Sequence, residues 1–152
     1  MEKLIYWKRQ YFGRTYTIFN EDAILGQLSI GLFGKNANGE YGDLKVMFSI
    51  KGIFNRPMYI INRETGELMG SAKFNFWRRK GIITLADHSE YILRYWNIWR
   101  SRWAISDSNG IQINYSKRFL KGNITTMTDN GLLILTGLFM NHYLANRNGN
   151  NG

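Results

Sequence analysis

The residues of this chain that could do chemistry are mainly cations set among aromatic rings. Seven Lys and Arg residues between positions 73 and 102 stand against two acids, Asp87 and Glu90. Such a mixture suits an anionic lipid surface, where each basic residue adds ~1 kcal/mol. It would also suit single-stranded nucleic acid, whose bases stack on aromatic side chains. The cations are Lys73, Arg78, Arg79, Lys80, Arg94, Arg100 and Arg102, interleaved with Phe74, Phe76, Trp77, Tyr95, Trp96, Trp99 and Trp103.

Six residues of this stretch form the candidate anion- or lipid-binding group. A loop over residues 77–80 would place one Trp beside three cations. The net charge of +9 and the pI near 9.9 agree with an anionic partner, although net charge describes association and not fold. The plain structural alternative is that the aromatic residues face a core while the Arg side chains solvate the outer face. The six candidates are Trp77, Arg78, Arg79, Lys80, Arg100 and Arg102.

Catalytic and metal-binding residues are absent from the sequence pattern. His88 lies in the polar run 86–90, which is typical of a turn, and His142 is expected to be a buried histidine with hydrogen-bond partners that could favour a helix C-terminus when charged. The chain has no Cys, which excludes disulfides and Cys-based zinc sites. The glycines between positions 31 and 42 lack the Gly-Lys-Ser/Thr ending of a phosphate-binding loop. We therefore expect a protein that is not an enzyme and has no cofactor or metal site.

Apolar and polar residues alternate from Leu4 to about Thr126, as in half-buried antiparallel strands. Examples are the buried faces expected for Leu28, Ile30 and Leu32 and for Val46, Phe48 and Ile50. Turn sequences recur every 8–12 residues or so with no helical pattern between them, which indicates an up-and-down sheet or barrel. The sequence therefore predicts a mainly β fold of about 10–12 strands.

Three hairpins along the chain share one pattern. An aromatic residue is followed two positions later by Ile, then by Asn or Asp, a short turn and a return strand. The copies begin at Tyr16, Tyr59 and Trp103, about 43 residues apart, which indicates a repeated unit. The Asn or Asp side chain would cap each turn, and Gly would supply a positive φ in the last two.

The segment from Asp129 to Asn146 predicts a helix, with Thr128 and Asp129 as N-terminal caps. It has no polar face, since residues 132–135 are all apolar and point in four directions; such a helix is buried. Its apolar run is far shorter than the ~20 residues that span a bilayer. Closing the meander removes its exposed edges, and a barrel of ten or more strands leaves room inside. We therefore expect a closed antiparallel barrel that encloses a helix over about 130–146.

The hairpin pattern and the final helix together resemble the tubby C-terminal-like superfamily, which includes the LURP-one-related proteins and the phospholipid scramblases. The resemblance rests on residues Tyr59–Gly70, Trp103–Lys117 and Asp129–Asn146. It implies a twelve-stranded barrel around a central helix and binding of phosphoinositides or action at membranes. The chain lacks the cysteine clusters and the acidic loop of scramblases, so calcium-driven scrambling is not expected. The tubby phosphoinositide-binding residues have no assignable counterparts here.

These observations predict a single tubby-like barrel domain over residues 1–146 and a disordered Asn/Gly tail over 147–152. We expect a non-enzymatic domain whose basic outer-face loops bind anionic membrane lipid with phosphoinositide-like headgroups. A lipocalin-like carrier of a small apolar ligand, which needs an empty lumen, and a nucleic-acid-binding module stay open as alternatives. Residues 1–14 have no secretory signal pattern and no transmembrane segment is expected, so we expect a cytoplasmic protein, peripheral at the membrane. The oligomeric state has no sequence signal.

Overall fold

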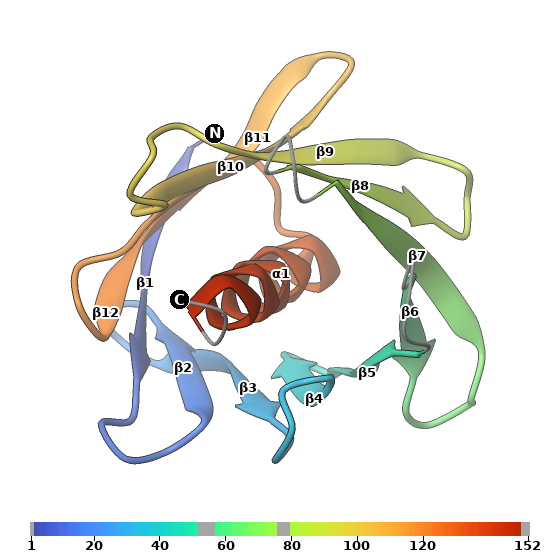
Figure 1. Ribbon diagram of the computed structural model, residues 1–152, viewed down its shortest axis with the longest axis horizontal. Helices are drawn as coiled ribbons and strands as arrows, with labels where there is room; N and C mark the ends of the chain where they lie inside the picture. The colour runs from blue at the N-terminus through green and yellow to red at the C-terminus, as the bar shows by residue number, and fades with distance from the viewer. Residues whose placement is uncertain (1, 52–56, 76–79, 150–152) are drawn as a thin grey trace.

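The structure is a computed structural model in which residues 2–51, 57–75 and 80–149 are described, with side chains described as far as Asn146. Within these residues, twelve strands form one closed antiparallel barrel around a single helix, α1 (Gly131–Gly149), as Figure 1 shows. The predicted barrel and enclosed helix are confirmed, and α1 continues beyond its expected end at Asn146. The strands are β1 (Lys3–Arg9), β2 (Thr15–Phe19), β3 (Ile24–Ile30), β4 (Asn36–Tyr41), β5 (Leu44–Ile50), β6 (Met58–Asn62), β7 (Leu68–Asn75), β8 (Lys80–Leu85), β9 (Glu90–Tyr95), β10 (Arg102–Asp107), β11 (Gly110–Ser116) and β12 (Lys121–Thr126).

Each strand pairs with the next along the chain, and β1 pairs with β12 to close the barrel. The alternation of the sequence becomes an inner and an outer face, so that Val46, Phe48 and Ile50 of β5 are all buried. The expectation for Leu32 was wrong. Strand β3 ends at Ile30, and Leu32 lies in the following turn with 69% of its side chain exposed.

The three repeated hairpins have the same irregularity at the same place. In each hairpin a β-bulge precedes the Asn or Asp residue, and the bulges lie at Ile18/Phe19, Ile60/Ile61 and Ile105/Ser106. The side-chain oxygens of Asn20, Asn62 and Asp107 then accept backbone N–H groups of the turn. Gly66 and Gly110 have φ values of 77° and 123°, as the turn chemistry requires. The repeated unit is confirmed.

The N-terminal cap of α1 differs from the expectation. The side-chain oxygen of Asn130 accepts the backbone N–H groups of Leu132 and Leu133, at 3.1 and 3.4 Å. A cap must directly precede the first helical residue for its oxygen to reach the second and third N–H groups, and Asn130 holds that position before Gly131. Thr128 and Asp129 were therefore the wrong caps; Asp129 pairs with Lys3 instead.

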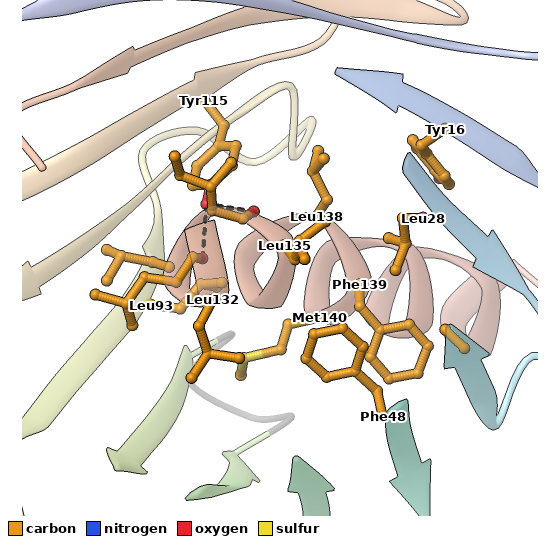
Figure 2. Packing of buried hydrophobic residues seen from close by; sticks show 14 of the residues in the cluster. Tyr16, Leu28, Phe48, Leu93, Tyr115, Leu132, Leu135, Leu138, Phe139 and Met140 are labelled. Carbon is orange, nitrogen blue, oxygen red and sulfur yellow. Dashed lines mark hydrogen bonds between the residues drawn. The ribbon is translucent and has the colours of Figure 1, made fainter. Parts of the chain in front are cut away.

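The barrel side chains pack around all sides of α1, as Figure 2 shows. Phe139 of the helix stacks on Phe48 with ring centroids 5.2 Å apart. Tyr115 donates its hydroxyl hydrogen to the helix carbonyls of Leu133 and Ile134, and the Trp103 indole donates to the carbonyl of Gly137. The strands therefore position the helix by polar contacts as well as by packing.

Replacing Leu135 by Asp should abolish cooperative unfolding. Leu135 is fully buried, and a carboxylate there would have neither water nor a counter-charge. Thermal unfolding followed by circular dichroism measures this, with Leu68→Asp as the matched control because the Leu68 side chain is 57% exposed. A melt of Leu135→Asp like that of the wild type would contradict the position of the helix.

Candidate functional site

The two ends of the barrel carry opposite charge. Because neighbouring strands are antiparallel, alternate connections lie at the same end. One end holds the start of α1 and the connections 20–23, 42–43, 63–67, 86–89 and 108–109. All 11 Asp and Glu residues lie there, in these connections, just before β1 or α1, or near the adjoining strand ends. We call it the acidic end.

The opposite end, which we call the basic end, includes the described connections 10–14, 31–35, 96–101 and 117–120. None of these connections contains Asp or Glu. Within the described residues the ion pairs are Lys3–Asp129 and Arg63–Glu40, and both lie at the acidic end. The cations of the basic end therefore have no carboxylate partner. The described ones are Arg14, Lys35, Lys51, Arg100, Lys117 and Arg118 in the connections, with Lys8, Arg9, Lys80, Arg94, Arg102 and Lys121 at the adjoining strand ends.

The basic end also exposes aromatic rings. Phe12 is 96% exposed, Phe33 86% and Trp99 80%. Tyr11 contacts both Phe12 and Phe119, so the connections 10–14 and 117–120 present one joined aromatic cluster. Every exposed aromatic residue among the described ones lies at this end; they are Tyr11, Phe12, Phe33, Trp96, Trp99 and Phe119.

Two adjoining hollows indent the outer wall beside the basic end, with volumes of about 360 and 570 Å³. Arg102, Ser116 and Asn123 line both, and we call the pair the wall groove. Strands β11 and β12 pair over only the three positions of residues 113–115 and then separate, which opens this part of the wall. The groove is also lined by three further cations, Lys117, Arg118 and Lys121, and by five aromatic residues, Tyr6, Trp7, Phe19, Trp96 and Tyr115.

Of the six predicted binding residues, the structure describes Lys80, Arg100 and Arg102. Arg102 pairs with Ser116 and lies in the wall groove. Arg100 has a φ of 58° and holds its guanidinium over the ring of Tyr95, 5.9 Å from the centroid. Lys80 pairs with Arg94 of β9, which separates it from Arg102 of β10. The other three candidates, Trp77, Arg78 and Arg79, lie outside the described residues.

Several residues of the basic end were missed from the sequence, because the search followed one contiguous window. Phe12, Phe33, Arg118 and Lys121 come from parts of the chain outside positions 73–102. The available signal was the parity of the meander: every second turn of an up-and-down barrel lies at the same end. Grouping alternate turns would have revealed one set without acids.

The basic end also encloses a buried polar cluster around the last turns of α1. The hydroxyl of Tyr16 and the Nδ1 atom of His142 are 2.7 Å apart, and the side-chain amide of Asn146 donates to Nε2 at 2.7 Å. Burial, with Arg9 and Lys117 nearby, lowers the pKa of His142 to about 4. The expectation of a buried, satisfied histidine is confirmed. The lowered pKa disfavours the charged imidazole, so the suggestion that His142 favours the helix C-terminus when charged stays a prediction.

Burial and the neighbouring Arg9 also lower the pKa of Lys117. The positive charge of Arg9 near Lys117 therefore adds to the effect of burial and is not offset there by a carboxylate. The basic end thus has the electrostatics of a site for anions.

Comparison with known protein families, curated proteins and solved structures gives no match. In the described part of the chain, no helix combines the length and the apolar character needed to cross a membrane. The same residues include no cluster of three or more His, Cys, Asp or Glu side chains that could hold a metal ion. The class that these observations define is a closed antiparallel barrel with an internal helix and oppositely charged ends.

The neutral His142 predicts a loss of stability in mild acid. Its pKa is about 4 in the folded chain and about 6.5 when unfolded, so the unfolded state binds the extra proton. The free energy of unfolding should therefore fall as pH drops from about 6.5 to about 4, by roughly 3 kcal/mol from this group. Urea unfolding at pH 7.0 and pH 4.5 measures it. In His142→Gln that part of the pH dependence should vanish. If the free energy of unfolding of this variant differs between pH 7.0 and pH 4.5 as much as that of the wild type, His142 is not the cause.

Proposed function

We propose that this protein is a non-enzymatic domain that binds anionic lipid surfaces through its basic end. The observation that carries the proposal is that unpaired cations and exposed aromatic rings share one end of the barrel, while all acids lie at the other. Anionic headgroups would attract the first end and repel the second. The barrel would then stand on the surface with one defined orientation, as a cytoplasmic protein peripheral at the membrane.

The exposed aromatic residues suit the polar boundary of a bilayer. Trp and Tyr are enriched at the depth of the headgroups, where a ring can be half in water and half in hydrocarbon. Trp99 and Phe12 extend from different connections, so several tips could enter the surface together. Basic residues beside them would add ~1 kcal/mol each near an anionic surface.

Two observations favour this function over the alternatives. Helix α1 fills the lumen in which a lipocalin-like carrier would hold an apolar ligand. Among the exposed rings of the described residues only Trp96 lines the wall groove, so these rings do not form a row along it, as stacking of successive bases would require. The resemblance to tubby-like proteins agrees with the proposal, and phosphoinositides are a suitable class of headgroup to include in its test.

The aromatic contribution can be tested by vesicle flotation. The double variant Phe12→Ser/Trp99→Ser should partition roughly tenfold more weakly to phosphatidylcholine vesicles with 30% phosphatidylserine, since about 1.5 kcal/mol or more of apolar burial is lost. The matched control is Ile24→Ser/Leu68→Ser, which removes exposed apolar side chains from the acidic end. Equal partitioning of both double variants would contradict an oriented attachment.

The contribution of charge needs separate variants. Arg118→Gln/Lys121→Gln should lose about 2 kcal/mol, roughly thirtyfold in partitioning, on the same vesicles at low salt. Lys45→Gln at the acidic end should have little effect, and salt should weaken all binding because it screens exposed charges. Vesicles with a phosphoinositide in place of phosphatidylserine test the headgroup class. Absence of binding at low salt would refute the proposal, and stronger binding to a single-stranded oligonucleotide would favour the nucleic-acid alternative.

A further inference from the structure

A third hollow lies at the mouth of the barrel, where the β1–β2 and β3–β4 connections meet the last turns of α1. Its volume is about 390 Å³, and no residue that lines it lines the wall groove. We call it the mouth hollow. Its lining includes four polar or charged side chains, Arg9, Arg14, His142 and Asn146, and three apolar ones, Ile30, Leu32 and Phe33.

Arg9, one of the residues that line this hollow, has a side-chain donor without a partner. Its Nε atom is buried and makes no hydrogen bond within the described residues. The guanidinium lies over the ring of Tyr16, 5.8 Å from the centroid, which holds it in place. A buried donor without an acceptor costs free energy, more so when it is charged, and such groups are rare in folded proteins. An anion bound beside this guanidinium would compensate its buried positive charge.

The charge around the mouth hollow is uncompensated. Arg14 is exposed beside Arg9 and forms no ion pair within the described residues, because every acid lies at the acidic end. His142 is neutral, and both of its ring nitrogens have partners in Tyr16 and Asn146. The end of α1 brings only about half a negative charge. Two guanidinium groups therefore face this space without a counter-ion.

We propose that the mouth hollow binds a phosphate monoester. Guanidinium groups match phosphate oxygens with paired N–H donors, and a doubly charged phosphate would balance two of them. The volume lies within the range of small-molecule sites and exceeds what a bare phosphate needs. Leu32 and Phe33 give an apolar wall for the organic part of the ligand. The site does not depend on membrane attachment, since a soluble ester and a lipid with a terminal phosphate could both reach it.

The first experiment titrates glycerol 3-phosphate and inorganic phosphate into the whole protein. We expect saturable binding by calorimetry and a shift of the Arg9 Nε–H resonance in NMR spectra. Arg9→Gln and Arg14→Gln should each weaken binding at least tenfold. Arg14 is exposed, so its variant remains informative if Arg9→Gln does not fold.

Lys35→Gln is the matched control for that titration, because it removes a charge from the same end without altering the lining of the mouth hollow. It should change the affinity less than twofold. An equal loss in Lys35→Gln would indicate general electrostatic attraction and overturn the site. So would an Arg9 Nε–H resonance that does not move.

A second experiment separates the two sources of the phosphate group. Phosphatidylcholine vesicles with phosphatidic acid, which has a terminal phosphate, are compared with phosphatidylserine vesicles of equal surface charge. A preference for phosphatidic acid that Arg9→Gln loses, while its binding to phosphatidylserine persists, supports the site with lipid as its source. Binding of glycerol 3-phosphate without a preference for phosphatidic acid supports the site with a soluble phosphate monoester as its ligand. If glycerol 3-phosphate does not bind and phosphatidic acid is not preferred, the proposed site is refuted. The proposed function can still stand in that case, because it depends on attachment to phosphatidylserine vesicles.

Discussion

The pairing of β1 with β12 is the constraint on which the rest of the structure depends. It joins residues 3–8 to residues 121–126 in unbroken register and turns a meander into a barrel. Closure removes the exposed edges, but it also creates a lumen that twelve strands cannot fill with their own side chains. The lumen must then hold an element that is apolar on every side. Helix α1 meets that condition, and closure therefore explains its composition.

A helix inside a barrel must also be held at one height and one rotation, which apolar packing alone defines poorly. The hydroxyl of Tyr115 and the indole of Trp103 reach helix carbonyls from β11 and β10 and supply direction. Close approach requires small residues where helix and wall meet. A side chain at Gly81 would collide with Met140, and one at Gly137 with Tyr115. The hydrogen bonds of Tyr115 and Trp103 and the two glycines therefore define the position of the helix, whereas apolar packing alone only keeps it inside the barrel.

Much of this architecture could be predicted from the sequence, because alternation and an all-apolar helix are local patterns with few three-dimensional solutions. The exposure of Leu32 and the cap at Asn130 were missed because each depends on the exact residue at which a strand ends or a helix begins. The site was predicted less well for a different reason. Its members come from connections far apart in the chain, and only the parity of the strands brings Phe12 and Phe119 to one end. The wall groove could not be predicted at all, since it depends on where the paired strands β11 and β12 separate.

Turn chemistry does not explain the separation of charge. Asn20 and Asn62 cap their turns through neutral amides, so the hairpins of the acidic end do not need carboxylates for that role. At the basic end the arrangement has a cost, because neighbouring cations add to the effect of burial in lowering the pKa of both Lys117 and His142. The orientation of α1 offsets part of it: its positive N-terminus lies at the acidic end and its negative C-terminus at the basic end. A helix dipole amounts to only about half a charge at each end, which leaves most of the positive field for an anionic partner to neutralise.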